Sequence, residues 1–140
     1  MSKTIAILAT LDTKADEANF MRQKLEELGG KALLIDIGVI GEAGVPADIT
    51  RNEIIEAGGS SLDTLLKNPS REEASPIVTA GATKILWDLQ ASGKIDGVVA
   101  MGGTQGTSTC APALQSLPYG FPKVMLSTAA SGDVGPFVGI

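Results

Sequence analysis

A glycine-rich stretch at residues 102–107 has the composition of an anion-binding loop. It follows a short apolar run at residues 98–101 and precedes an Ala- and Leu-rich segment of helical character. Glycines let a phosphate approach the backbone, and the free N–H groups and dipole of a helix N-terminus attract negative charge. The stretch is neither a Walker A loop nor a full GxGxxG, so a plain strand-to-helix turn is the alternative. Its candidate ligand-binding residues are Gly102, Gly103, Thr104, Gly106 and Thr107.

A second small, hydroxyl-rich stretch at residues 127–133 could help to hold the same ligand. It follows an apolar run at residues 122–127, at the expected end of a neighbouring strand. Two such loops at adjacent strand ends could grip one anion between them, and a flexible turn is the alternative interpretation. Its candidate ligand-binding residues are Ser127, Thr128, Ser131 and Gly132.

The residues Asp12, Thr13 and Lys14 stand where the first strand is expected to become a helix. Lys14 has the charge to bind a phosphate, and Asp12 could bind Mg²⁺ or a ligand hydroxyl. Asp12 or Thr13 could instead cap the helix, because short polar side chains accept hydrogen bonds from first-turn N–H groups. Both interpretations place the three residues at the end of a strand.

Asp36 lies near the end of the second expected strand, where many nucleotide-binding sheets carry an acid that binds ribose hydroxyls. The first loop lacks the glycine fingerprint that accompanies such an acid, so a surface aspartate facing a loop N–H is the alternative. Arg51 and Lys84 are predicted to be solvated charges. Trp87 is predicted to pack within a helical layer, and Cys110 to be a small core residue.

Apolar runs and helical periodicity alternate along the chain and predict how these residues are positioned. Strands are expected at residues 4–9, 31–38, 95–101 and 122–127. Helices are expected at 14–28, from a cap at Asp48 or Thr50 to residue 57, at 60–67, at 72–92 with Pro76 in the first turn, and after the glycine-rich stretch to about residue 117. This alternation predicts a three-layer α/β/α Rossmann-like sandwich with a mainly parallel sheet of at least four strands. Ligands bind such sheets beyond the carboxyl ends of the strands, where all the candidate residues lie.

Composition limits the chemistry that the chain can perform. The 140 residues amount to one domain and include no histidine and a single cysteine. This excludes Ser-His-Asp and Cys-His catalysis, histidine metal sites and an intrachain disulfide. The net charge is −5 without a basic cluster, so nucleic acid is not an expected partner. No apolar run approaches the length of about 18 residues that spans a membrane. No signal peptide is evident either, so we expect a cytoplasmic protein that does not contact a membrane.

Four blocks of sequence, taken in order, resemble one known family. They are KTIAILATLDTKADEANFMR, LLIDIGVIGE, IDGVVAMGGTQGT and PKVMLSTAASGDVGPFVG, and together they cover nearly the whole chain. They are similar to the start of the Tm-like ATP-binding family, which is named for a tomato protein that blocks replication of tomato mosaic virus. Its members usually carry glycine at the position of Gln105, so this chain has a long polar side chain in the expected phosphate loop.

The resemblance implies a Rossmann-like ATP-binding region built from two α/β subdomains, of which residues 1–140 would be the first. ATP, with Mg²⁺ as a companion, would lie against residues 102–107, residues 127–133 and the turn at residues 12–14. Because family members are considerably longer, a second subdomain or a second copy of the chain is the expected partner. The uncharged stretch at residues 134–140 fits a surface that needs such a partner.

Two other functions remain open from the sequence. The first is a protein-interaction module in which the nucleotide only stabilises the fold. The second is an enzyme that acts on a small phosphorylated or carboxylated metabolite. No residue is an evident general base, so the sequence does not decide whether ATP is hydrolysed or whether the chain is an enzyme at all.

Overall fold

Four parallel strands form the central sheet of this computed structural model, which describes residues 3–67 and 71–127. The strands are β1 (Thr4–Ala9), β2 (Lys31–Asp36), β3 (Gly97–Gly102) and β4 (Lys123–Ser127), and their order in the sheet is β2-β1-β3-β4. Every pairing is parallel, with Ala6 of β1 opposite Leu33 on one side and Val98 on the other. The strands are short apolar runs because both faces of the sheet are covered over most of its width.

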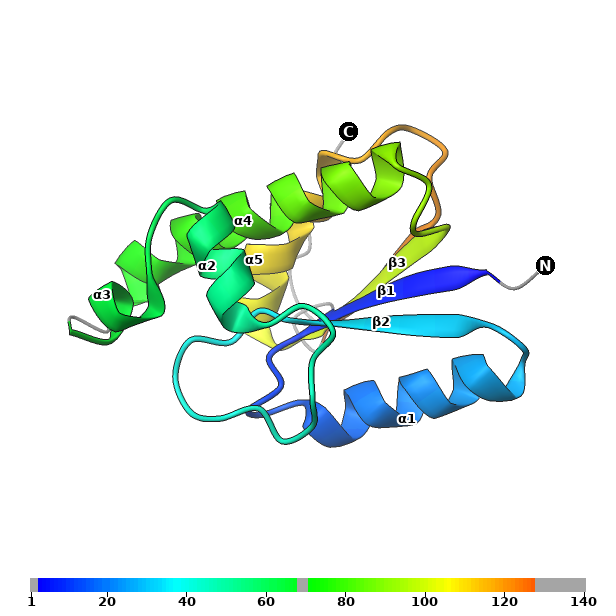
Figure 1. Ribbon diagram of the computed structural model, residues 1–140, viewed down its shortest axis with the longest axis horizontal. Coiled ribbons are helices and arrows are strands. Elements are labelled where there is room, and N and C mark those ends of the chain that lie inside the picture. The colour runs from blue at the N-terminus through cyan, green and yellow to red at the C-terminus, as the bar shows by residue number, and fades with distance from the viewer. Residues whose placement is uncertain (1–2, 68–70, 128–140) are drawn as a thin grey trace.

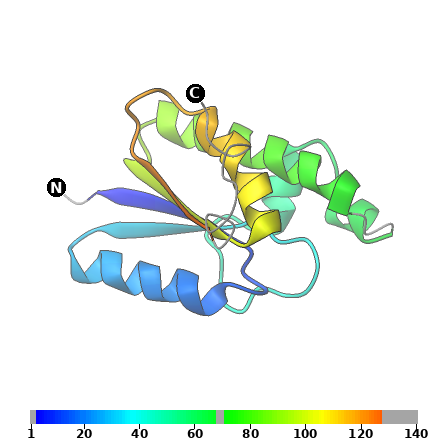
Figure 2. The ribbon, with the colours of Figure 1, turned by 180° about the vertical axis from the view of Figure 1, so that it is seen from behind.

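Helices lie on both faces of the sheet, as Figures 1 and 2 show. Among the described helices, one face carries only α1 (Ala15–Glu27). The other carries α2 (Arg51–Ala57), α4 (Arg71–Ala91) and α5 (Thr104–Gln115), and the short α3 (Leu62–Lys67) follows α2. Residues of β1 alternate between the two cores: Leu8 packs beneath α2, α4 and α5, whereas Ile7 packs beneath α1. The predicted three-layer Rossmann-like sandwich is confirmed.

The strand order creates a point where the connections change direction. The chain leaves β1 through α1 to reach β2, then returns across the other face to β3 and continues through α5 to β4. Right-handed crossovers in opposite directions put their helices on opposite faces, as observed. The carboxyl ends of β1 and β3 therefore flank the topological switch point, where open α/β sheets bind their ligands.

Two glycines let α2 and α4 cross in direct contact. A Cβ added to Gly81 would lie 1.8 Å from the carbonyl oxygen of Ile54, and one added to Gly58 would lie 2.1 Å from that of Ile77. No side chain fits at such distances, so the backbones themselves form the contact. This packing fixes α2, and with it the residues at the N-terminus of α2, against the sheet.

Several local predictions need correction. Pro76 lies in the second turn of α4, which begins at Arg71, and not in the first turn. Packing of α4 against α2 and α5 outweighs the one helical hydrogen bond that proline removes. The second strand ends at Asp36 and not at residue 38, and the Trp87 side chain is 42% exposed. No helix in the described ranges is long and apolar enough to cross a membrane.

Candidate functional site

The junction between β3 and α5 is a single residue, Gly103. The predicted loop at 102–107 is therefore shorter than expected, because Gly102 still belongs to β3 and Thr104 already begins α5. Gly103 is the N-cap residue and has no side chain with which to cap the helix. First-turn N–H groups have no acceptor within a helix, so those of residues 104–106 are available to a ligand at the carboxyl edge of the sheet.

Gly102 serves the packing of this junction. A Cβ on Gly102 would lie 2.7 Å from the Cα of Gly106 and 3.1 Å from the backbone nitrogen of Thr107. The first turn of α5 thus rests directly on the end of β3, which only glycine permits. By contrast, a Cβ on Gly106 would meet only the carbonyl oxygen of Met101, at an ordinary 3.5 Å. Close helix-to-strand packing is one of the roles of glycine in dinucleotide-binding folds.

Two hydroxyl groups tie this junction to the neighbouring strand. The Thr107 hydroxyl donates to the carbonyl oxygen of Gly103 at 2.6 Å and also pairs with the Ser127 hydroxyl at the end of β4. Thr107 has one O–H, which the Gly103 carbonyl uses, so Ser127 is the donor in the second bond. The Thr107 side chain is buried. In this structure the two predicted ligand residues therefore bond to each other, and Thr107 also bonds to the backbone, so that they stabilise the junction of α5 with β3 and β4.

The turn between β1 and α1 lies beside this junction, at the end of the neighbouring strand. The backbone N–H groups of Thr13 and Lys14 both donate to the carbonyl oxygen of Thr10, at 3.1 and 2.8 Å. Helix α1 has its N-cap at Lys14, and no side chain caps it. The alternative that Asp12 or Thr13 caps this helix is therefore wrong, because the helix begins one residue later, after an ammonium side chain that cannot accept a hydrogen bond. The Asp12 side chain is exposed.

Asp36 and Arg51 form a buried ion pair at the end of β2. Arg51 Nε lies 2.9 Å from Asp36 Oδ2, and the two side chains are only 8% and 2% exposed. Asp36 Oδ1 accepts hydrogen bonds from the backbone N–H groups of Leu11, at 3.2 Å, and Gly38, at 2.9 Å. Three donors thus occupy the carboxylate that was predicted to bind ribose. A ribose hydroxyl would have to compete with them.

The prediction that Arg51 is a solvated charge is wrong, because its side chain is buried. Besides the ion pair, its Nη1 donates to the carbonyl oxygens of Ile40 at 3.2 Å and Gly41 at 2.6 Å. It therefore fastens the loop that follows β2 onto the end of the sheet. Its Nη2 is buried and has no hydrogen-bond partner among the described residues. A buried donor left without an acceptor is costly and rare in native proteins.

Gly38 marks the point where three charged side chains meet. A Cβ built on Gly38 would lie 2.8 Å from Arg51 Nη2, 3.0 Å from Asp12 Oδ1 and 3.1 Å from Asp36 Oδ1. Asp12 also lies against Gly41, whose φ of +77° only glycine adopts readily. The absence of a side chain at Gly38 therefore brings the exposed carboxylate of Asp12 next to the buried ion pair.

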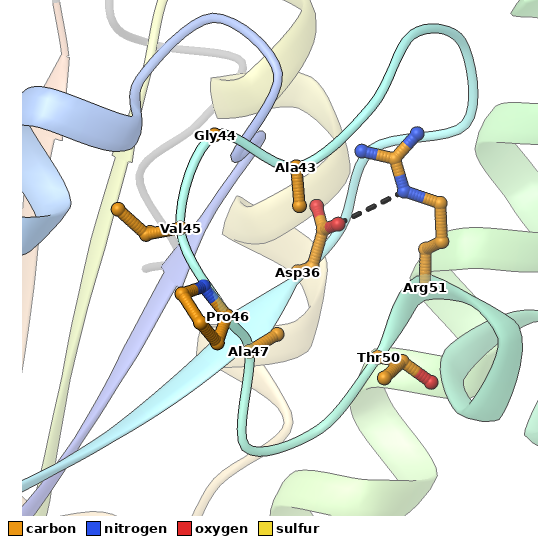
Figure 3. A pocket seen from close by; sticks show the side chains of 8 residues that line it. All are labelled: Asp36, Ala43, Gly44, Val45, Pro46, Ala47, Thr50 and Arg51. Carbon is orange, nitrogen blue, oxygen red and sulfur yellow. Dashed lines mark hydrogen bonds and ion pairs between the residues drawn. The ribbon is translucent and has the colours of Figure 1, made fainter.

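A pocket of about 360 Å³ opens beside the ion pair (Figure 3). Backbone contacts at two points hold the loop after β2 beside this pocket. Gly44 N donates to the carbonyl oxygen of Leu11 at 2.8 Å, and residues 48 and 49 run along the outer edge of β2. Helix α2 begins here with a capping box between Thr50 and Glu53, which confirms Thr50 as its N-cap. The pocket is lined by Asp36, Ala43, Gly44, Val45, Pro46, Ala47, Thr50 and Arg51.

The structure thus brings most predicted site residues to one edge of the sheet. Thr128, Ser131 and Gly132 lie outside the described residues, as does the stretch at 134–140. Cys110 is fully buried in the core, as predicted, and burial raises the pKa of its thiol to about 12. Within the described ranges, no group of three or more Asp, Glu or Cys side chains is arranged to hold a metal ion.

Sequence reasoning missed Arg51 and the pocket wall at residues 43–47. One signal was available for Arg51, because it occupies the first position of its helix, where the dipole disfavours a positive charge. A cation in that place suggests a buried anionic partner. The pocket wall had no comparable signal, because its residues are small and apolar and its shape depends on the path of the loop.

Comparison with known proteins places the chain in a family. Residues 3–140 match the N-terminal domain of the uncharacterised protein family UPF0261. A UPF0261 protein of Clostridium tetani is 41% identical over 99% of this chain and 34% of its own length. A UPF0261 protein of Rhizobium meliloti is 35% identical over 99% of this chain and 34% of its own length.

A plant protein belongs among these relatives. The ToMV susceptible protein tm-1(GCR26) of Solanum lycopersicum is 28% identical over 99% of this chain and 20% of its own length. The family resemblance seen in the sequence is therefore confirmed, and the chain belongs to the UPF0261 family. It spans about a third of the length of the bacterial relatives that it matches.

Proposed function

We propose that this member of the UPF0261 family binds a nucleotide, with ATP as the ligand and its phosphates at the N-terminus of α5. The observation that carries the proposal is the uncapped start of α5, with Gly103 as N-cap, at the topological switch point. A helix N-terminus carries about half a positive charge and presents backbone N–H groups. Together these features favour a phosphate over a neutral ligand.

The turn at residues 12–14 supplies side chains of the right kind beside that helix. Lys14 is a cation at the N-cap of α1, in the turn that follows β1, and β1 is the strand next to β3. Asp12 does not cap α1, so its exposed carboxylate is available. Mg²⁺ in nucleotide sites is commonly held by one or two carboxylates together with the phosphates, which suits a single aspartate here. Thr107 and Ser127 would then support the phosphate site through the hydrogen bonds that hold α5 on β3 and β4.

Calorimetric titration of the chain with ATP, with and without Mg²⁺, tests the proposal. The Gly103→Val variant should lose ATP binding, because a branched side chain at the N-cap covers the N–H groups of the first turn. Urea unfolding of the same variant checks that the fold survives. ATP at 100 times its dissociation constant should stabilise the wild-type chain by about 2.7 kcal/mol and leave the variant unchanged. Equal ATP affinity in a folded Gly103→Val variant would remove this helix from the site.

A protein-interaction module is the second candidate, supported by an uncovered part of the sheet. On the face that carries α1, the β4 side chains of Val124 and Leu126 are 51% and 45% exposed. They neighbour Val99 and Met101 of β3 in the register, and α1 lies over β1 and β2 instead. β4 is the outermost strand among the described residues. Exposed apolar surface beside an edge strand commonly accepts a partner, here a second copy of the chain or the remainder of a longer polypeptide.

Sedimentation at micromolar concentration tests this second candidate. A self-associating wild-type chain should become monomeric when Leu126 is changed to Lys, because the charge would have to be buried in the contact. The matched control is Leu66→Lys on α3, a leucine of similar exposure far from this face. A wild-type chain that is monomeric throughout would refute self-association through β4.

A further inference from the structure

The pocket at the end of β2 has two chemically different sides. One wall consists of small side chains from the loop after β2, and Figure 3 shows the methyl group of Ala43 pointing into the pocket toward Asp36. The opposite side carries the buried Asp36–Arg51 ion pair and the N-cap residue Thr50. An apolar wall facing a few fixed polar groups is the usual composition of a site for a small organic molecule. A volume of about 360 Å³ is near the lower end of the range for such sites.

One nitrogen of the ion pair has no hydrogen-bond partner among the described residues. Arg51 is 7% exposed, and its Nη2 lacks an acceptor among the residues that the structure describes. The position that a Cβ of Gly38 would occupy lies about as close to this nitrogen as to Asp12 Oδ1. No ligand atom fits at that position, which is one bond length from Gly38 Cα, but the distances show that Nη2 and Asp12 Oδ1 lie on the same side of Gly38. A hydroxyl group that enters beside these two atoms, after a small outward shift of the loop at residues 39–44, could accept from Nη2 and donate to Asp12. Such a pair of partners suits a sugar hydroxyl better than an anion, which Asp12 and Asp36 would repel.

The strand order sets the distance between the pocket and the N-terminus of α5. β2 and β3 are the two neighbours of β1, so their ends are separated by two strand spacings, or about 10 Å. That separation is on the scale of a mononucleotide from its base to its phosphates. The turn at residues 12–14, at the end of β1, lies between the two positions.

We infer that the pocket lined by residues 43–47 and Arg51 binds the base and ribose of the nucleotide, so that the ligand lies across the end of β1 with its phosphates at α5. The base packs against the small apolar side chains of the loop. The ribose hydroxyls face Arg51 Nη2 and Asp12 Oδ1, which leaves the other carboxylate oxygen of Asp12 for Mg²⁺. This inference rests on the proposed nucleotide-binding function and adds to it the residues that recognise the nucleoside.

Separate probes for the two halves of the ligand test the inference. Adenosine reports on the pocket alone, inorganic triphosphate on the phosphate site alone, and ATP on both. The Ala43→Trp variant fills the pocket from its wall and leaves both members of the ion pair unsubstituted. The Glu42→Trp variant is the matched control, because Glu42 is the exposed neighbouring residue and does not line the pocket. Urea unfolding confirms that both variants fold.

Ala43→Trp should weaken adenosine and ATP binding at least about tenfold and leave triphosphate binding unchanged, while Glu42→Trp changes none of the three. Conversely, Gly103→Val should weaken triphosphate and ATP while adenosine still binds. If ATP binds but Ala43→Trp binds it as the wild type does, or if triphosphate binds as tightly as ATP, the nucleoside does not use this pocket and the proposed function still stands. If neither ATP nor its two halves bind the wild-type chain, both proposals are overturned.

Discussion

Replacing Arg51 by methionine should destabilise the chain far more than the loss of a surface charge would. Methionine has a similar length and keeps the apolar part of the side chain packed, but it removes the guanidinium group. The change breaks the 2.9 Å ion pair with Asp36 and two hydrogen bonds to the loop carbonyls of Ile40 and Gly41. It also leaves the Asp36 carboxylate buried with only two backbone N–H partners.

The size of this effect follows from the burial of both partners. Breaking a buried ion pair by removing one member costs about 3–5 kcal/mol, because the remaining charge stays uncompensated. Loss of a solvated charge changes stability by no more than about 0.5 kcal/mol. Since small domains are stable by about 5–15 kcal/mol, Arg51→Met could remove a large part of the stability. With an m-value of about 1–3 kcal/mol per molar urea, the unfolding midpoint should fall by at least about 1 M.

Urea unfolding followed by circular dichroism measures this difference, with Lys84→Met as the control, because Lys84 is an exposed cation on α4. The double variant Arg51→Met with Asp36→Asn should be more stable than the sum of the single changes predicts, since the second change removes the stranded charge. A loss below about 1 kcal/mol for Arg51→Met, equal to that for Lys84→Met, would show that Arg51 is solvated and that the loop after β2 follows another path.

Three further comparisons between variants test other parts of the structure. Gly81→Ala should cost more than the 1–3 kcal/mol or so that is typical of overpacking, as measured by urea unfolding. Gly106→Ala, at a helical glycine with room for a methyl group, should leave stability unchanged or raise it, and equal costs would refute the direct contact of α2 and α4. Asp12→Ala should weaken ATP binding, measured by calorimetry, while the melting temperature stays nearly constant, because Asp12 does not cap α1. Thr50→Ala should instead lower stability by about 1 kcal/mol, because Thr50 caps α2. An Asp12→Ala variant that is destabilised but binds ATP normally would contradict the role assigned to Asp12. Burial raises the pKa of Cys110 from 9.0 to about 12, so the unfolded chain loses this proton first and stability should fall as pH rises from 9 to 12. Cys110→Ala should lack this part of the pH dependence, and identical pH profiles would contradict it.

The fold could be predicted because its signals are local and agree with one another. Continuous apolar runs such as residues 4–9 have the composition of strands covered on both faces, and helical periodicity separates them. The parallel order then follows from the handedness of the connections. Cys110 was assigned to the core correctly, and Thr50 was one of the two caps predicted for its helix, because an apolar helix face and a helix start are short-range patterns.

The site depended on contacts that no short-range pattern contains. Asp36 and Arg51 are 15 residues apart, and they meet only because the loop between them folds back along β2. Gly102 has the sequence context of a phosphate-binding glycine, yet its missing side chain makes room for Gly106. In both cases the sequence indicates the edge of the sheet correctly. The role of the individual residue is decided by its neighbours in space.

The central claim is that nucleotide phosphates bind at the N-terminus of α5, and a titration of the ¹⁵N-labelled chain with Mg²⁺–ATP, followed by NMR, tests it most directly. The backbone amide signals of residues 103–106 should move with ATP concentration, and inorganic triphosphate should move the same signals. Signals of the exposed β4 residues Val124 and Leu126, on the face that carries α1, should stay in place. Saturable shifts that leave residues 103–106 unaffected, or no shifts at millimolar ATP, would contradict the claim.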